Sequence, residues 1–159
     1  MTLRRMVGKW AILFSQLGLT TQVSNTIKIG KKEVRPSFRR GRYTISFIKQ
    51  KNTITRNNIP LLQILDAIRY IKKIPDAAIV SSCKRLLAIL NSLSLKDKAA
   101  LVKLALKYPP SARALLGTLL EDTGNGQLTG ALKKSLNPIT IYKLPGVNKI
   151  SVAGKWNIK

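Results

Sequence analysis

Two consecutive prolines, Pro109 and Pro110, interrupt the most strongly helical part of this 159-residue chain. Proline has a fixed φ and no amide hydrogen, so a helix cannot continue through the pair, whereas a proline suits the first position of a new helix. Beyond the pair, apolar residues recur at helical spacing: Ala112, Leu115, Leu116 and Leu119. The pattern predicts two helices that meet at a rigid corner, the second of them packed in the core.

The helical period extends over residues 59–137 and predicts a central bundle of four to five helices. Pro75 ends the first predicted helix, and Asp76 is placed to cap the second. Ser94 followed by Asp97 is typical of a helix start, with Asp in place of the usual Glu or Gln. The inward faces are predicted to carry Leu61, Ile64, Leu65, Ile68, Ile71, Ile79, Cys83, Leu86, Leu87, Leu90, Leu101, Leu104, Ala105, Tyr108, Leu128, Ala131, Leu132 and Leu136.

Strand patterns flank the helical portion on both sides. Val23–Ile29 and Arg42–Lys49 alternate β-branched and aromatic residues and predict two strands. Near the other end, Ile139–Leu144 and Lys149–Val152 alternate around Pro145-Gly146 and predict a C-terminal β-hairpin. Trp156 is expected to anchor the last strand.

The predicted fold class is therefore α+β, formed as a single domain over residues 1–159. An amphipathic N-terminal helix through Leu3, Val7, Trp10, Phe14 and Leu17 opens a basic helix-and-strand portion. The portions are residues 1–58, then the helical residues 59–137, then the C-terminal strands of residues 138–159.

The charge of the chain is one-sided. There are 29 Lys and Arg residues against 6 Asp and Glu, a formal net charge of +23. Residues 1–58 hold 13 of the cations and a single acid, Glu33. Such an excess favours a polyanion or an anionic surface as partner. Because 45% of the residues are apolar, the chain can also bury a core, so it is not a disordered basic tail.

The cations cluster most densely between the two predicted N-terminal strands, in a basic loop over residues 31–42. Phosphate groups bind such flexible cations, and Phe38 and Tyr43 could stack on a base. The alternative is a solvated basic loop; Lys72, Lys73, Lys96, Lys103 and Lys107 are expected to be solvated helix faces of this kind. The predicted nucleic-acid-binding residues are Lys31, Lys32, Arg35, Arg39, Arg40, Arg42, Lys49, Lys51 and Arg56.

No catalytic or metal-binding constellation is predicted. The chain has no His, and its one cysteine, Cys83, falls on a helical apolar face, which excludes a disulfide framework and a His- or Cys-rich zinc cluster. Glu121 and Asp122 are the only adjacent acids, and a structural role at a helix end is expected for them. Asp66, placed among apolar residues, is expected to pair with Arg69. We therefore expect a non-enzyme without cofactors.

Five short stretches follow one another in a characteristic order: Leu17–Thr26, Ile59–Asp76, Tyr108–Gly117, Lys133–Pro138 and Lys155–Ile158. Their order and spacing resemble the C-terminal domain of AbiEi-like antitoxins of bacterial type IV toxin–antitoxin systems, over roughly residues 13–159. The resemblance implies a cytoplasmic antitoxin and transcriptional autoregulator that binds DNA. It also implies a nucleotidyltransferase-like toxin as functional partner, counteracted without a stable complex.

In that family an N-terminal winged helix binds the operator DNA. The residues before Leu17 are too few for such a domain, so either this chain is a shortened member or the basic loop binds the DNA. Two alternatives remain open. One is a structural RNA- or DNA-binding protein, of the ribosomal or nucleocapsid kind; the other is a membrane-surface accessory protein anchored by residues 1–19. A membrane span is not expected, because the longest apolar runs are only about five residues.

Overall fold

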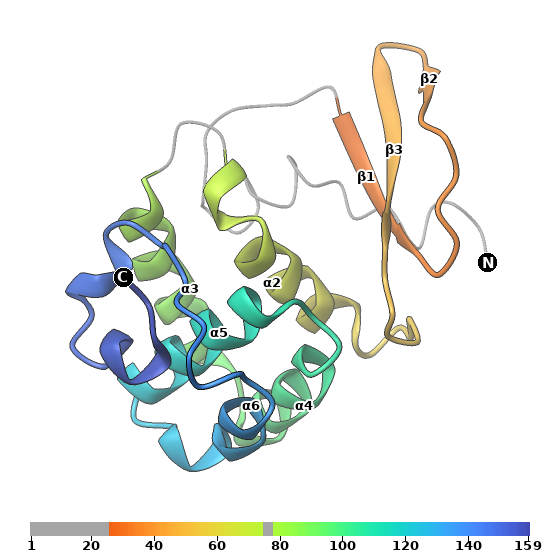
Figure 1. The fold of residues 1–159 in the computed structure, drawn as a ribbon. Coiled ribbons are helices and arrows are strands. Elements are labelled where there is room, and N and C mark those ends of the chain that lie inside the picture. Colours follow the sequence, from red (N-terminus) through yellow and green to blue (C-terminus); the bar gives the residue numbers. More distant parts are fainter. Residues whose placement is uncertain (1–25, 75–77) are drawn as a thin grey trace.

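A small β-sheet stands beside a bundle of helices in the computed structural model, which describes residues 26–74 and 78–159 (Figure 1). The described part has five α-helices and one three-stranded sheet, and this arrangement confirms the predicted α+β class and the four- to five-helix bundle. Three predictions fall wholly or partly outside the described residues: the N-terminal helix, the first residues of the first strand, and the cap formed by Asp76.

The sheet has the strand order β1-β3-β2, with β1 at Thr26–Lys31, β2 at Phe38–Arg40 and β3 at Tyr43–Lys49. β1 runs parallel to β3, so that Lys31 lies opposite Lys49, and β2 pairs with β3 in the antiparallel direction. Strand β2 lies inside the segment predicted to be a loop, which is a correction. All three of its side chains are exposed, so no alternation marked it; the turn at Gly41, with φ of 60°, and the free edge of β3 create it.

The helix starts at Ser94 and at the Pro109–Pro110 pair are confirmed, whereas α2 ends at Arg69, before a 3₁₀ turn at Ile71–Lys73, and Pro75 lies outside the described residues. Ser94 Oγ accepts a hydrogen bond from the Asp97 amide at 3.1 Å, and Pro110 is the first residue of α5. The predicted fifth helix is shorter than expected, a 3₁₀ turn at Gly126–Leu128 followed by α6. The α-helices are α2 (Ile59–Arg69), α3 (Ile79–Ser92), α4 (Leu95–Ala105), α5 (Pro110–Asp122) and α6 (Gly130–Lys134).

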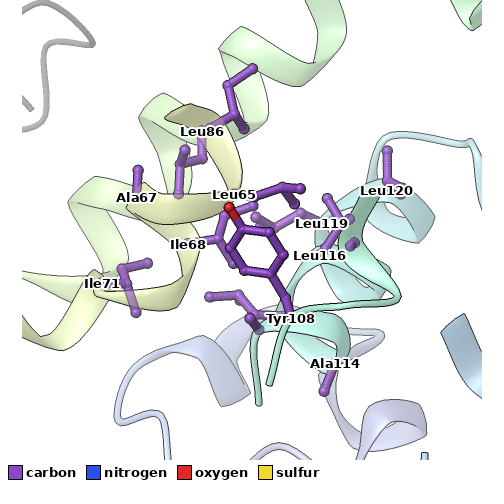
Figure 2. Packing of buried hydrophobic residues seen from close by; sticks show 14 of the residues in the cluster. Leu65, Ala67, Ile68, Ile71, Leu86, Tyr108, Ala114, Leu116, Leu119 and Leu120 are labelled. Carbon is purple, nitrogen blue, oxygen red and sulfur yellow. The ribbon is translucent and has the colours of Figure 1, made fainter. Parts of the chain in front are cut away.

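Helix α5 lies at the centre of the bundle. It packs against α2, α3, α4 and α6, and every residue from Ala114 to Leu120 is buried. Figure 2 shows Leu116 and Leu119 of α5 beside Leu65 and Ile68 of α2, with the ring of Tyr108 among them. Helix α2 contributes the face that the sequence predicts, since Leu61, Ile64, Leu65 and Ile68 are all buried. The core is thus formed mainly by the helices.

The prediction of a C-terminal β-hairpin is wrong. Residues 147–149 and 153–156 form 3₁₀ turns, and the strand contact of this region is one parallel bridge between Tyr142 and Ile158. Gly146 and Asn157 have positive φ values of 91° and 55° and turn the chain back on itself. The segment thereby buries Val147, Ala153 and Trp156. The packed turns are more stable than an isolated two-stranded hairpin would be, because they bury these apolar side chains against the helices.

Trp156 anchors this C-terminal segment on α5 instead of on a strand. Its indole packs over Gly117, where a β-carbon would overlap the ring. Its Nε1 donates a hydrogen bond to Glu121 Oε2 at 2.7 Å, which is the main reason that the pKa of Glu121 lies below its usual value. Lys155 also pairs with Glu121, at 3.3 Å. Glu121 therefore has the structural role expected for it.

We predict that Gly117→Ala destabilises the fold. Overpacking against the indole typically costs about 1–3 kcal/mol and outweighs the roughly 1 kcal/mol that Ala gains over Gly in a helix. Urea unfolding followed by circular dichroism measures the change. Gly130→Ala is the matched control, because a β-carbon there meets nothing within 4 Å. Equal stability of the two variants would contradict the packing described for Trp156.

Candidate nucleic-acid interface

The nine predicted binding cations lie on the strands and connecting loops of the sheet or on the segment that joins it to α2. Eight of them are exposed, and Lys31 is half-buried. They form two groups, which we call the tip cluster (Arg39, Arg40 and Arg42) and the base cluster (Lys31, Lys32, Arg35, Lys49 and Lys51). Strand register sets the two groups apart, because Arg40 lies opposite Tyr43 whereas Lys31 lies opposite Lys49. Tyr43 and Lys49 lie about 20 Å apart along β3, and this distance separates the two clusters. Arg56 lies further along the chain, near the start of α2.

The tip cluster sits on the hairpin formed by β2 and β3. Arg39 and Arg40 are successive strand residues, so they point to opposite faces of the sheet and cannot both meet a flat ligand. The guanidinium of Arg42 lies 5.1 Å from the centroid of the Tyr43 ring and donates a hydrogen bond to its hydroxyl at 3.0 Å. Arg42 therefore covers one face of Tyr43. The hairpin resembles a basic ribbon with cations on both faces.

Phe38 is the aromatic side chain of the sheet that remains accessible. The residue is 45% exposed, and its ring packs at a tilt against Phe47, with 6.1 Å between the ring centroids. Lys31 Nζ lies 5.6 Å from the centroid of Phe47. An exposed ring surrounded by cations can stack on a base while the cations hold the backbone.

The base cluster borders a shallow groove of about 390 Å³. Lys31, Lys32 and Arg35 line it together with Glu33 and residues 52–54. Glu33 is the single acid of residues 26–58, and its charge offsets part of the positive field there. This groove alone is therefore a weaker anion site than the number of cations suggests.

A second cleft, the corner cleft, lies where the end of β3 meets the Pro109–Pro110 corner. It has a volume of about 600 Å³. Sequence reasoning missed it, because Lys107 was expected to lie on a solvated helix face and Arg113 was not among the predicted binding residues. The cations flanking both sides of the proline pair are the feature that could have indicated it. The lining residues are Lys49, Gln50, Lys51, Arg69, Leu106, Lys107, Tyr108, Pro109, Pro110 and Arg113.

A buried hydrogen-bond network joins the basic sheet to the bundle at this point. The Tyr108 hydroxyl donates to Asp66 Oδ1 at 2.7 Å and accepts from Gln50 Nε2 at 2.9 Å. Asn52 Nδ2 donates to Gln50 Oε1 at 3.2 Å and to the Leu104 carbonyl at 2.9 Å. The hydrogen-bond partner of Asp66 is therefore Tyr108, and the expected pairing with Arg69 is reduced to a charge effect at longer range.

Burial perturbs the titration of the groups in this network. Desolvation raises the pKa of Asp66 from 3.8 to about 6, although the hydrogen bond from Tyr108 and the charge of Arg69 oppose the shift. Burial likewise raises the pKa of Tyr108. Elsewhere in the core, burial raises the pKa of the Cys83 thiol to about 11, so the thiol is not activated as a nucleophile.

The described part of the chain shows neither a metal site nor a membrane-spanning helix. Across residues 26–74 and 78–159, no group of three or more His, Cys, Asp or Glu side chains is placed to hold a metal ion. Among the helices of these residues, none has both the length and the apolar character needed to cross a membrane.

Comparison with known proteins adds no relative. No protein-family model matches the chain, and no curated protein or solved structure matches it. The AbiEi-like resemblance stays a prediction.

Asp66→Asn is predicted to change how stability depends on pH. The folded-state pKa lies above the unfolded one, so the native protein binds the proton more tightly. This carboxyl therefore contributes most to the free energy of unfolding below about pH 4, and that contribution is lost as the pH rises through 6. Between pH 4 and pH 7, the free energy of unfolding of the wild type should fall relative to that of the variant by up to about 3 kcal/mol.

Urea unfolding of both proteins at several pH values tests this expectation. Glu33→Gln provides a control that removes one carboxylate from an exposed loop. If the stability of Asp66→Asn runs parallel to that of the wild type from pH 4 to pH 7, Asp66 does not titrate as its buried position requires.

Proposed function

We propose that this protein binds nucleic acid through its basic sheet and acts without catalysis of its own. The observation that carries the proposal is the grouping of nine cations on the sheet and the segment after it, eight of them exposed, with Glu33 as the only acid of that region. Each phosphate that a Lys or Arg neutralises releases condensed counterions, which favours binding at moderate salt. The two-faced tip cluster and the exposed Phe38 suit a groove or a strand better than a small anion.

The proposed role for this binding is that of an antitoxin and transcriptional autoregulator acting on DNA in the bacterial cytoplasm. It is supported by the ordered stretches that resemble AbiEi-like C-terminal domains. In this role the functional partner is a nucleotidyltransferase-like toxin, counteracted without a stable complex. Co-expression with such a toxin encoded beside this gene should restore growth, and the purified proteins should elute separately in size-exclusion chromatography.

A structural RNA-binding protein is the second candidate, and the net charge of +23 is what favours it. The two candidates differ in measurable ways. Much tighter binding to RNA than to DNA, together with no rescue of growth from a co-encoded toxin, would replace the antitoxin proposal with this one.

Replacing Arg35, Arg39, Arg40 and Arg42 together with Ala should weaken binding to duplex DNA and flatten its salt dependence. The slope of log K against log salt falls by about 0.9 for each phosphate that the protein no longer neutralises, so a decrease of roughly 2–4 is expected. Fluorescence anisotropy with a labelled duplex at increasing KCl concentrations measures the slope.

The matched control removes four lysines on the helices, Lys84, Lys96, Lys103 and Lys134, all of them exposed. It lowers the net charge by the same amount and should change the slope of log K against log salt only slightly. An unchanged salt dependence in the arginine variant would reject the sheet as the binding surface.

A further inference from the structure

We propose that the corner cleft is a second phosphate-binding site, which holds the backbone of the same nucleic acid after it has crossed the sheet. The inference rests on the proposed function and deepens it. It assigns binding roles to Arg69, Lys107 and Arg113, which lie on the helical bundle and far from the sheet in the sequence.

The charge of the cleft is the first argument. Of the ten described residues that line it, five are cations and none is an acid; the cations come from the end of β3, from α2, and from both sides of the proline corner. Like charges gathered around a concave, partly apolar surface raise the local positive potential, and an anion relieves their mutual repulsion. The acid behind the cleft wall, Asp66, is only 9% exposed and is hydrogen-bonded to Tyr108.

Two of the five cleft cations, Arg69 and Arg113, have contacts that orient their guanidinium groups. Arg113 Nη1 donates a hydrogen bond to the Ser135 carbonyl at 2.9 Å, which orients the guanidinium. The guanidinium of Arg69 lies 5.1 Å from the centroid of the Tyr70 ring. Such preorganised groups lose less conformational freedom on binding than mobile lysines do. The start of α5, with Pro109 as cap, adds a favourable dipole at the same corner.

Continuity with the sheet identifies the ligand as a nucleic-acid backbone. Lys49 and Lys51 line the corner cleft, and Lys49 lies opposite Lys31 in the sheet, so the positive surface of the base cluster continues into the cleft. Arg69 in turn lines a neighbouring groove of about 330 Å³ together with Lys72, Lys73 and Lys143. A chain of phosphates can follow this sequence of cations, whereas a single small anion would use only one part of it.

The test compares two double variants that each remove two positive charges. Arg69→Gln with Lys107→Gln changes the cleft, and Lys84→Gln with Lys96→Gln changes exposed positions on α3 and α4 outside the three grooves described. Circular dichroism and thermal unfolding establish that both variants are folded. Anisotropy titrations with duplex and single-stranded DNA of equal length, over a range of KCl concentrations, give the salt slopes.

The cleft variant should lose about 2 from its salt slope and bind roughly 10- to 100-fold more weakly near 0.1 M salt, while the control should stay close to wild type. A cleft variant that behaves like the control, while the sheet arginine variant loses binding, overturns this inference and leaves the proposed function in place. If the wild-type protein binds neither DNA nor RNA, the proposed function fails and the inference fails with it.

Titration with inorganic pyrophosphate separates the two sources of phosphate. The Nε–Hε signals of Arg69 and Arg113 in NMR spectra report binding in the cleft. Weak shifts at millimolar pyrophosphate, abolished by excess DNA, support a backbone site. Tight binding of pyrophosphate with an unaltered DNA salt slope in the cleft variant would overturn the inference in favour of a free phosphate ligand.

Discussion

The hydrogen bond from the Tyr108 hydroxyl to Asp66 is the interaction on which the arrangement of the two parts depends. Through Gln50 and Asn52 the same network extends to the end of β3 and to the last turn of α4, so it connects the sheet, α2 and the proline corner. A buried polar network of this kind is costly if one member loses its partner, because the remaining groups stay desolvated. It therefore holds the sheet in one position, and the corner cleft lined by Lys49 and Lys51 acquires a defined shape.

Charge and burial are divided between the two parts of the molecule. The bundle supplies most of the apolar core, with α5 at its centre and Trp156 closing it from the C-terminal side. The sheet and the segment after it carry the densest positive charge. A net charge of +23 opposes a compact state through self-repulsion, so apolar burial must stabilise the fold against it. A polyanionic ligand would remove that repulsion, which links the proposed function to stability.

Much of the bundle could be predicted because its determinants are local. Apolar residues at helical spacing, a serine cap and prolines that cannot continue a helix all act within a few residues. The nine candidate binding cations were chosen in the same way, as a dense run in the sequence, and the structure shows eight of them exposed. Predictions failed where local pattern and tertiary packing diverged. Ile139–Leu144 alternates like a strand, yet it pairs through a single parallel bridge instead of a hairpin, because the segment that follows turns back to bury Trp156 on α5.

The amino-acid sequence by itself determined the helical faces, the rigid corner at Pro109 and Pro110, and the concentration of positive charge near the N-terminal end. These features follow from backbone sterics, side-chain period and composition. The tertiary structure decided the rest: strand β2, the Tyr108 partner of Asp66, and the meeting of Lys49, Arg69 and Arg113 in one cleft. Residues so far apart come together only through packing, whose energy depends on the whole core and leaves no local trace in the sequence.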